Sequence, residues 1–197
     1  LHGAIAEVVK MPEVVKQLDT SGTEISFDVD YSRFNNHRQL NLSDSLYDVH
    51  ESKVRSPHGI RNDGRTRVTI KSAKTDLVLP FSKAAKLEAG LKASFVETDN
   101  RLLYDSLVGK VYVPALSQSD RFVYKENILA AYSTYKHSWK KVDLQAGLRV
   151  ERTTSEGISH SLQSNIKRTY TDFFPSLAAD YKFTEDHKIG LSYSRRI

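Results

Sequence analysis

The side chains that could perform chemistry are scattered, and they match no known catalytic or metal-binding pattern. There is no cysteine, which excludes thiolate metal sites, cysteine nucleophiles and disulfides. Walker, GxSxG, HExxH and EF-hand patterns are also missing, and Gly109-Lys110 lacks the upstream glycine of a Walker loop. The seven histidines are not spaced as metal ligands, and most lie in segments expected to be loops or turns: His2, His37, His50, His58, His137, His160 and His187. We therefore expect no catalytic residue, no metal site, no cofactor and no enzymatic activity.

Two kinds of charged group were considered as binding sites. Asp28 and Asp30 share one face of an expected strand, but polar lining of a water-filled interior is a stronger interpretation than a catalytic pair. Basic residues near two strand ends could form a mouth for an anionic ligand: Arg33, His37 and Arg38 near one end, and Arg61, Arg65 and Arg67 near the other. The favoured interpretation is that these charges are solvated at the base of loops. The pattern singles out no ligand-binding residue.

Composition limits the class of protein. The chain has 197 residues, of which 27% are charged and 39% hydrophobic, and its mean hydropathy is −0.47. No stretch approaches the roughly 18 apolar residues of a membrane-spanning helix, but a membrane β-strand needs only about 9–11 residues, half of them polar. The net charge of +5 is spread along the chain and mixed with acids, which argues against a nucleic-acid partner.

The dominant pattern is an alternation of apolar and polar residues, which is the period of a β-strand. It is clearest in three segments: Thr23–Phe34, Ala85–Thr98 and Lys140–Glu151. Four more segments are weaker: Thr66–Leu79, Phe122–Tyr135, Phe173–Phe183 and Lys188–Ile197. The sequence thus predicts an all-β, antiparallel meander of about seven strands over residues 23–197. Residues 1–22 form a separate leading segment without an assigned function, in which Ala4–Leu18 is compatible with a helix interrupted at Pro12.

The connections alternate between short and long. Short turns are expected at Pro80–Ala84, Lys136–Ser138 and Thr184–His187. Long loops are expected at Asn35–Arg65, Asn100–Arg121 and Arg152–Asp172, and these are the candidate ligand-contacting regions. Tight turns on one side and long loops on the other are typical of an outer-membrane β-barrel.

Aromatic residues bracket the aliphatic part of the strands. Near the short turns we expect Phe81, Tyr132, Tyr181 and Phe183, and near the long loops Tyr31, Phe95, Tyr124 and Phe173. Between them lie Ala89, Leu91, Ala130, Ala146, Leu148 and Ala179. Two aromatic belts around an aliphatic band indicate a lipid-facing barrel wall that is not closed. The alternative is a soluble β-sandwich binding module, for example a carbohydrate-binding one, that buries the same stripe.

A short motif with an internal glycine recurs. Leu87–Lys92 resembles Leu144–Arg149, and Ile189–Ser192 is a partial copy. Each glycine is expected on the polar face of a strand that leaves a short turn. Curvature of the wall is the favoured explanation, and close approach by material filling the lumen is the alternative.

The order of these motifs resembles the barrel region of TonB-dependent receptors, in particular the outer-membrane β-barrel family of the Bacteroidetes type. The resemblance rests on Phe122–Tyr132, Leu144–Glu151, Phe173–Leu177 and Leu191–Ile197, with Leu79–Phe81 and Leu87–Lys92 earlier in the chain. It implies a plugged barrel in the outer membrane of a Gram-negative cell that imports a nutrient. Energy would come from the TonB complex through an N-terminal part that this chain does not show.

The ends of the chain suggest a piece of a longer protein. Leu1 stands where a start methionine is expected, and Ile197 lies inside a strand pattern. Seven strands cannot close a barrel. We therefore expect that the wall contacts outer-membrane lipid and that the isolated segment self-associates through its exposed edges and apolar face.

Overall fold

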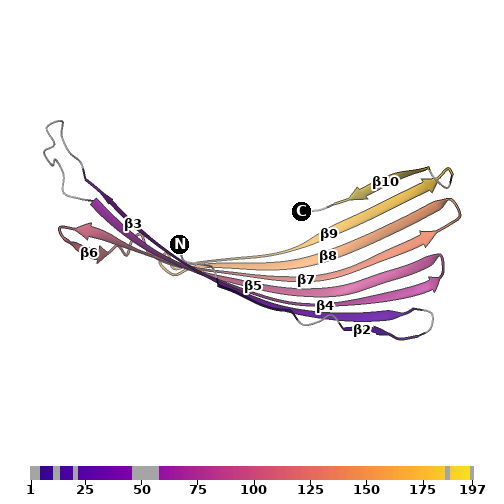
Figure 1. Ribbon diagram of the computed structural model, residues 1–197, viewed down its shortest axis with the longest axis horizontal. Coiled ribbons are helices and arrows are strands. Elements are labelled where there is room, and N and C mark those ends of the chain that lie inside the picture. The colour runs from indigo at the N-terminus through magenta and orange to yellow at the C-terminus, as the bar shows by residue number, and fades with distance from the viewer. Residues whose placement is uncertain (1–4, 11–13, 20–21, 46–57, 185–186, 196–197) are drawn as a thin grey trace.

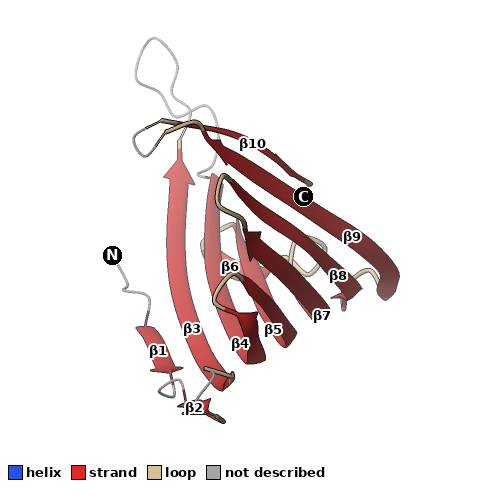
Figure 2. Cartoon of the chain, turned by 90° about the vertical axis from the view of Figure 1, so that its right-hand side faces the viewer, coloured by secondary structure: helices blue, strands red, loops and turns tan. Residues whose placement is uncertain are grey.

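The chain forms a single antiparallel sheet. The computed structural model describes residues 5–10, 14–19, 22–45, 58–184 and 187–195. Ten strands pair in the order β1-β3-β4-β5-β7-β8-β9-β10, while β2 pairs with β3 and β6 pairs with β5. Figure 2 shows these strands side by side in one curved layer, with β1 and β10 at opposite edges. The predicted antiparallel meander is confirmed, and it contains more strands than the seven expected.

The strands are long for a globular protein, in which about 5–6 residues is usual. Their bounds are β1 (Ile5–Lys10), β2 (Val14–Gln17), β3 (Glu24–Asp44), β4 (His58–Ser82), β5 (Ala85–Val108), β6 (Val111–Pro114), β7 (Asp120–Ser138), β8 (Val142–Ser159), β9 (Ser164–Lys182) and β10 (Lys188–Ser194). The short connections β4–β5, β7–β8 and β9–β10 gather at one end of the sheet (Figure 1). We call this the turn end and the opposite one the outer end.

The three expected loops are largely strand, so the predicted loop bounds are wrong. β3 continues to Asp44 and β4 begins at His58, while β5 continues to Val108. Between β8 and β9 only the turn 160–163 remains, and Asp120 fixes it by accepting hydrogen bonds from Ser159 Oγ at 2.9 Å and the Ser161 amide at 3.0 Å. The strands were missed because their alternation changes polarity toward the outer end, as described below.

The expected helix in the leading segment is also wrong for the residues described there. β1 pairs with β3 from Ile5 opposite Asn35 to Lys10 opposite Asp30, and β2 pairs with β3 closer to the turn end. Backbone pairing at the edge of β3 satisfies these amides and overrides a weak local preference for helix. Among the described residues there is no helix long and apolar enough to cross a membrane.

The register divides the residues between two faces, because directly paired residues point to the same side of the sheet. Leu77, Ala89 and Ser133 share one face through their pairing, and so do Tyr135, Ala146 and Leu177. This face carries the apolar rows that run across the whole sheet, and we call it the apolar face. The opposite face is called the inner face.

The apolar face has no partner within the described residues. Large side chains on it remain exposed, including Leu91 at 59% and Leu191 at 80%. The sheet is one layer (Figure 2), so these side chains are not buried in a β-sandwich. An apolar surface that runs across the whole sheet favours a lipid environment. In lipid, hydrogen-bonded β-strands of a barrel and α-helices are the two structures that give every backbone amide and carbonyl a hydrogen-bond partner.

The height of the apolar band supports this assignment. On β5 it runs from Leu87 to Phe95, on β8 from Val142 to Val150, and on β9 from Phe173 to Tyr181. Nine residues span about 26–30 Å along a strand, or about 20–23 Å across the membrane at a tilt of about 40°, close to the band of about 25 Å in outer-membrane barrels. Tyr31, Phe95 and Phe173 mark the outer edge of the band, and Tyr135 and Tyr181 lie near its other edge.

The predicted face of β7 is wrong. Tyr132 pairs with Gly90 and Arg149, and Ala130 pairs with Lys92 and Glu151, so both lie on the inner face together with Tyr124. The apolar face of β7 carries Leu129, Ala131 and Tyr135 instead. The error arose because β7 has apolar residues on both faces, which removes the clean alternation.

The inner face is held together by polar contacts across strands. Tyr132 lies over Gly90, and its hydroxyl donates a 2.5 Å hydrogen bond to Asp76 Oδ1 on β4. Asp76 also pairs with Lys74 Nζ at 2.5 Å, and the Arg149 guanidinium lies 5.2 Å from the centre of the Tyr132 ring. The glycine therefore serves a close approach, but the approaching group is a side chain of the neighbouring strand rather than material in the lumen.

A pair of cysteine variants tests the two faces, because the natural chain has no cysteine. Ala178 pairs with Ser192 on the inner face, and Ala179 pairs with Leu191 on the apolar face. In lipid bilayers we expect Ala179→Cys to react with a water-soluble maleimide several-fold more slowly than Ala178→Cys, since hydrocarbon disfavours the reactive thiolate. After denaturation in detergent both should react equally. Faster labelling of Ala179→Cys in the bilayer would show that the faces are reversed.

The Gly90 contact gives a second prediction. A Cβ at this position would lie 2.5 Å from Cζ and the hydroxyl of Tyr132, so Gly90→Ala should destabilise the folded protein by about 1–3 kcal/mol in chemical denaturation. Gly64→Ala is the matched control, because its nearest contact would be Leu102 Cδ1 at 3.4 Å. In a Tyr132→Ala background the cost of Gly90→Ala should fall, and the remainder should come from Asp76 Oδ1, which would lie 2.6 Å from the new Cβ. An equal cost in both backgrounds would reject the steric explanation.

Candidate functional site: an arginine-lined hollow

The apolar side of the sheet becomes charged beyond the outer edge of the apolar band. On this side, the register aligns His37, Arg65, Arg101 and Arg121 in one row across four strands. The next row toward the band contains Asn35, Arg67 and Asp99. At the same level the inner face carries both apolar and polar side chains. Phe34, Val68 and Tyr124 lie in one inner row, and Phe122 lies in the next row with Asn36, Thr66 and Asn100. The charged side chains are thus on the outside of the wall, above the lipid-facing rows.

These charged rows surround a hollow of about 910 Å³. Its lining comprises Asn35, Asn36, His37, Arg65, Thr66, Arg67, Asp99, Arg101, Arg121 and His160. Four arginines and one aspartate leave an excess of three positive charges when both histidines are neutral. The hollow is wide and polar, which suits an anion better than an apolar ligand. We call it the arginine hollow.

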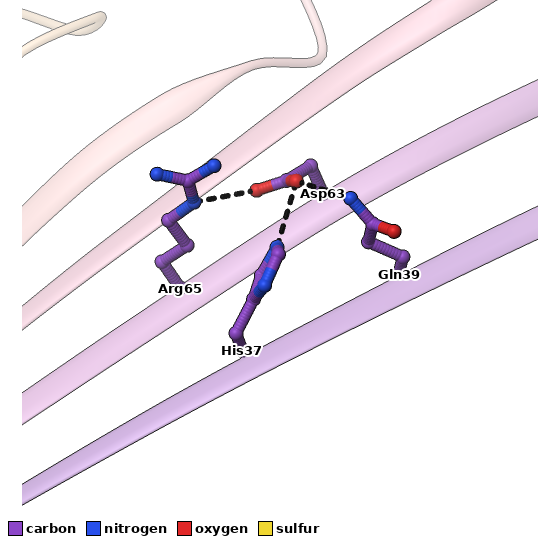
Figure 3. A network of polar contacts seen from close by, with 4 residues as sticks. All are labelled: His37, Gln39, Asp63 and Arg65. Carbon is purple, nitrogen blue, oxygen red and sulfur yellow. Dashed lines mark hydrogen bonds and ion pairs between the residues drawn. The ribbon is translucent and has the colours of Figure 1, made fainter. Parts of the chain in front are cut away.

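Asp63 orients two of the lining residues (Figure 3). Its Oδ1 accepts a 3.0 Å hydrogen bond from Arg65 Nε, and its Oδ2 is bonded to His37 Nε2 at 2.8 Å and Gln39 Nε2 at 3.0 Å. Hydrogen bonds from Gln39 and His37, followed by the Arg65 contact, lower the pKa of Asp63 to about 2. The carboxylate is therefore ionised at neutral pH and holds the Arg65 side chain by Nε.

The other arginines are positioned in a similar way. Arg67 Nε donates to Asn35 Oδ1 at 3.2 Å. Arg121 forms a bidentate pair with Asp99, with Nε 3.0 Å from Oδ1 and Nη2 2.8 Å from Oδ2, and this contact lowers the pKa of Asp99 and raises that of Arg121.

Donor groups of the arginine hollow remain available for a ligand. The Nη groups of Arg65 and Arg67 donate to no other residue in the described ranges, and Arg101 forms no hydrogen bond or ion pair there. The hollow can therefore offer oriented guanidinium donors to an external anion, which is the geometry that carboxylates and phosphates accept.

Only some of the basic residues considered for a mouth lie together, and the binding of an anion there stays a prediction. His37, Arg65 and Arg67 do come together. Arg61 lies on the same face but farther out, with its guanidinium 3.8 Å from the centre of the Tyr112 ring. Arg38 pairs with Gly64 on the inner face and does not take part. The mouth is also on the outside of the wall rather than in the lumen, because these residues share the face of the apolar band.

Several lining residues were missed from the sequence. Asp99, Arg101, Arg121 and His160 belong to strand ends and a turn that were expected to be loops, and only the register brings them beside β4. Asp28 and Asp30 lie on the inner face, where Ser72 Oγ donates a 3.2 Å hydrogen bond to Asp30. In the part of the chain that the structure describes, no group of three or more histidine, aspartate or glutamate side chains is arranged to hold a metal ion.

Comparison with known proteins agrees with this fold. The model of the "Outer membrane protein beta-barrel family" matches residues 16–197. The chain therefore belongs to this family, whose place is the outer membrane of Gram-negative cells. No curated protein matches the chain in sequence.

Two solved structures share the arrangement of strands. One is the unliganded ferric citrate transporter FecA, with a TM-score of 0.61 and 11% identity over 92% of this chain. The other is the ferric-catecholate import receptor Fiu from E. coli K12, with a TM-score of 0.66 and 9% identity over 97% of this chain. The chain spans 26% and 32% of these proteins. At such low identity the likeness establishes a common fold.

The low pKa of Asp63 predicts a pH dependence. A carboxyl group whose pKa is lowered by folding stabilises the protein above its ordinary pKa of 3.8, and this contribution is lost as the pH falls toward about 2. Asp63→Asn should therefore be less stable than the natural protein at pH 7, and the difference should vanish between pH 4 and pH 2. Thermal unfolding in detergent at pH 7 and at pH 2–4 measures the stability of both proteins.

Asp105→Asn is the matched control, because Asp105 lies on the same face and forms no hydrogen bond or ion pair with another described residue. It should change stability little at either pH. A difference between Asp63→Asn and the natural protein that stays constant down to pH 2 would contradict the assigned role of Asp63.

Proposed function

We propose that this chain is part of the wall of a TonB-dependent receptor that takes up a nutrient ligand across the outer membrane. Outer strand ends and loops would capture the ligand, and energy would come from the TonB complex through a part of the receptor outside this chain. The described residues supply scaffold and binding surface, and the protein is not an enzyme.

The observation that carries this proposal is the change in side chains along the inner face. A water-filled pore is lined by polar side chains, as the inner face is around Asp76 and Lys74. Toward the outer end the lining gains apolar and aromatic side chains, namely Phe34, Val68 and Phe122, beside polar ones. Such a surface favours contact with a ligand or with a plug inside the barrel over free passage of water.

The division of the chain into a leading segment, 1–22, and a wall, 23–197, remains part of the proposal. The pairing of β1 and β2 with β3 and the family match from residue 16 favour extending the wall into the leading segment. The proposed partners are outer-membrane lipid on the apolar face, the TonB complex and an unidentified ligand. An isolated segment would self-associate through its unpaired edges, which light scattering without detergent measures.

The first experiment tests the class of protein. Outer-membrane extract that contains the natural protein is passed over the immobilised periplasmic domain of TonB from the same cells. We expect retention of the protein, and of FecA or Fiu as positive controls in the matching E. coli system. Failure to retain the natural protein while a known receptor of the same cells is retained would reject the proposal.

A second experiment tests the inner surface. Leu102 and Leu103 are neighbours on β5 with nearly equal exposure, 38% and 39%, but Leu102 pairs with Gly64 on the inner face and Leu103 with Asp63 on the outside. The first probes are ferric citrate and ferric catecholate labelled with radioactive iron. They are chosen because FecA is a ferric citrate transporter and Fiu a ferric-catecholate import receptor, and both share the fold of this chain. For a probe that accumulates, we expect Leu102→Ser to reduce uptake several-fold and Leu103→Ser to leave it unchanged. Equal effects would contradict a luminal ligand surface, and accumulation of neither probe would exclude ferric chelates of these kinds as the ligand.

A further inference from the structure

The arginine hollow is on the wrong side of the wall for a ligand that passes through the barrel. His37, Arg65, Arg101 and Arg121 share the face of Leu91 and Ala131, which is the face assigned to lipid. An anion that reaches these side chains therefore comes from outside the barrel. This position calls for a partner other than the imported nutrient.

The height of the hollow identifies the layer from which such a partner comes. Asp99 and Arg101 follow Phe95 by four and six residues on β5, which is about 10–15 Å above the aromatic belt at about 3.3 Å per residue and a tilt of about 40°. The headgroup layer of a phospholipid bilayer extends only about 5–8 Å beyond the hydrocarbon on each side. A phosphate on a larger, saccharide headgroup reaches the arginines, whereas that of an ordinary phospholipid does not.

The surface between the hollow and the hydrocarbon is continuous along the same strands. A smaller recess directly below the hollow is lined by Lys71, Phe95, Lys125 and Glu97, with Lys125 Nζ 3.9 Å from Glu97 Oε2. Farther toward the turn end, Ala73, Ala93 and Ala131 leave a shallow apolar hollow of about 520 Å³ between the bulkier Phe27, Leu91 and Leu129. Strands β4, β5 and β7 thus present an apolar groove, a basic rim and an arginine cluster in that order. This is the order of acyl chains, headgroup base and phosphate in an amphiphilic lipid.

We infer that the arginine hollow binds the phosphate groups of a phosphorylated glycolipid of the outer leaflet. The acyl chains of this lipid lie over the apolar groove formed by Ala73, Ala93 and Ala131. Arg65, Arg67 and Arg101 supply the contacts, because Arg121 is already paired with Asp99. Asp63 and Asn35 hold the first two guanidinium groups by Nε, so that their Nη groups meet the phosphate oxygens. The inference rests on the proposed placement of the apolar face in lipid and is independent of TonB-dependent uptake.

The test uses the natural protein, purified in mild detergent from outer membranes and examined by native mass spectrometry and in nanodiscs. The probes are the cells' own outer-leaflet glycolipid, the same glycolipid after enzymatic removal of its phosphates, and phosphatidylglycerol. We expect the phosphorylated glycolipid to be retained and the other two to bind at least about tenfold more weakly, since they lack the phosphate groups that the guanidinium donors bind or do not reach these donors. Equal binding of the dephosphorylated glycolipid would overturn the inference.

Matched variants locate the site. Arg67→Gln combined with Arg101→Gln should lower glycolipid retention at least about tenfold and weaken its dependence on salt. Arg38→Gln combined with Arg168→Gln removes the same charge from the inner face and should change neither. Equal loss in both double variants would show that net charge rather than this site attracts the lipid, and would overturn the inference.

Two further readouts separate the possible failures. Unchanged thermal unfolding of the double variants shows that lost binding is not lost folding, and Arg67→Lys combined with Arg101→Lys keeps the charge if the glutamine variants unfold. Displacement of the glycolipid by millimolar inorganic phosphate, with no preference for its acylated form, would identify a site for free phosphate and reject a lipid site. Retention on immobilised TonB decides the receptor class separately, so either conclusion can fail alone.

Discussion

The structure depends on one constraint, which is that every backbone amide and carbonyl within the hydrocarbon must find a hydrogen-bond partner in the protein. The ladders between β3 and β9 meet it for the strands in the middle of the sheet, since almost every residue of β4, β5, β7 and β8 is paired on both sides. Pairing of this kind fixes the side-chain period at two, and each residue is then committed to one of two very different surroundings. Along β5, Leu91 and Phe95 are committed to lipid while Gly90 and Lys92 face the interior. The outer edge of the membrane is visible where this assignment reverses, between Phe95 and Asp99.

The same reversal explains which parts of the fold could be predicted from the sequence. In Ala85–Thr98 and Lys140–Glu151 the apolar and polar sets are cleanly separated, so strand and face were predicted correctly. The short turn expected at Lys136–Ser138 is wrong in its bounds, because β7 continues to Ser138 and the turn occupies residues 139–141. Beyond the band, Arg65, Arg67 and Asp99 point outward while Val68 and Tyr124 point inward. This pattern of mixed polarity is typical of a loop, although the backbone is still paired. The face of β7 was predicted wrongly for a related reason, because this strand carries a tyrosine on each face, Tyr132 on the inner one and Tyr135 on the apolar one.

The interior contacts were beyond prediction, because they depend on register rather than on residue type. Gly90, Tyr132 and Asp76 lie far apart in the sequence, and only the pairing of β4, β5 and β7 brings them together. The Tyr132 ring crosses β5 at Gly90, where there is no Cβ to obstruct it. The ring in turn covers the backbone that Gly90 leaves exposed. The repeated motif around Gly90 and Gly147 had suggested a common cause. The structure gives each glycine a different neighbour: Tyr132 over Gly90, but the hydroxyl groups of Ser176 and Thr134 at Gly147.

The hydrogen-bond acceptors of the candidate site orient the arginines without occupying all of their donor groups. Asp63 and Asn35 each accept from an arginine Nε, which fixes the direction of the guanidinium group while its terminal nitrogens stay exposed. Asp99 engages Arg121 with both oxygens and so neutralises it, which places the neutralised arginine at the border of the cluster rather than among its donors. On the inner face at the same level, the aromatic side chains of Phe34 and Phe122 lie beside the uncharged polar side chains of Asn36 and Asn100. The two sides of one wall therefore suit two different partners, an anionic one outside and a less polar one within. Neighbouring residues of β5 therefore face different partners, since Leu102 points to the interior and Leu103 to the outside of the wall.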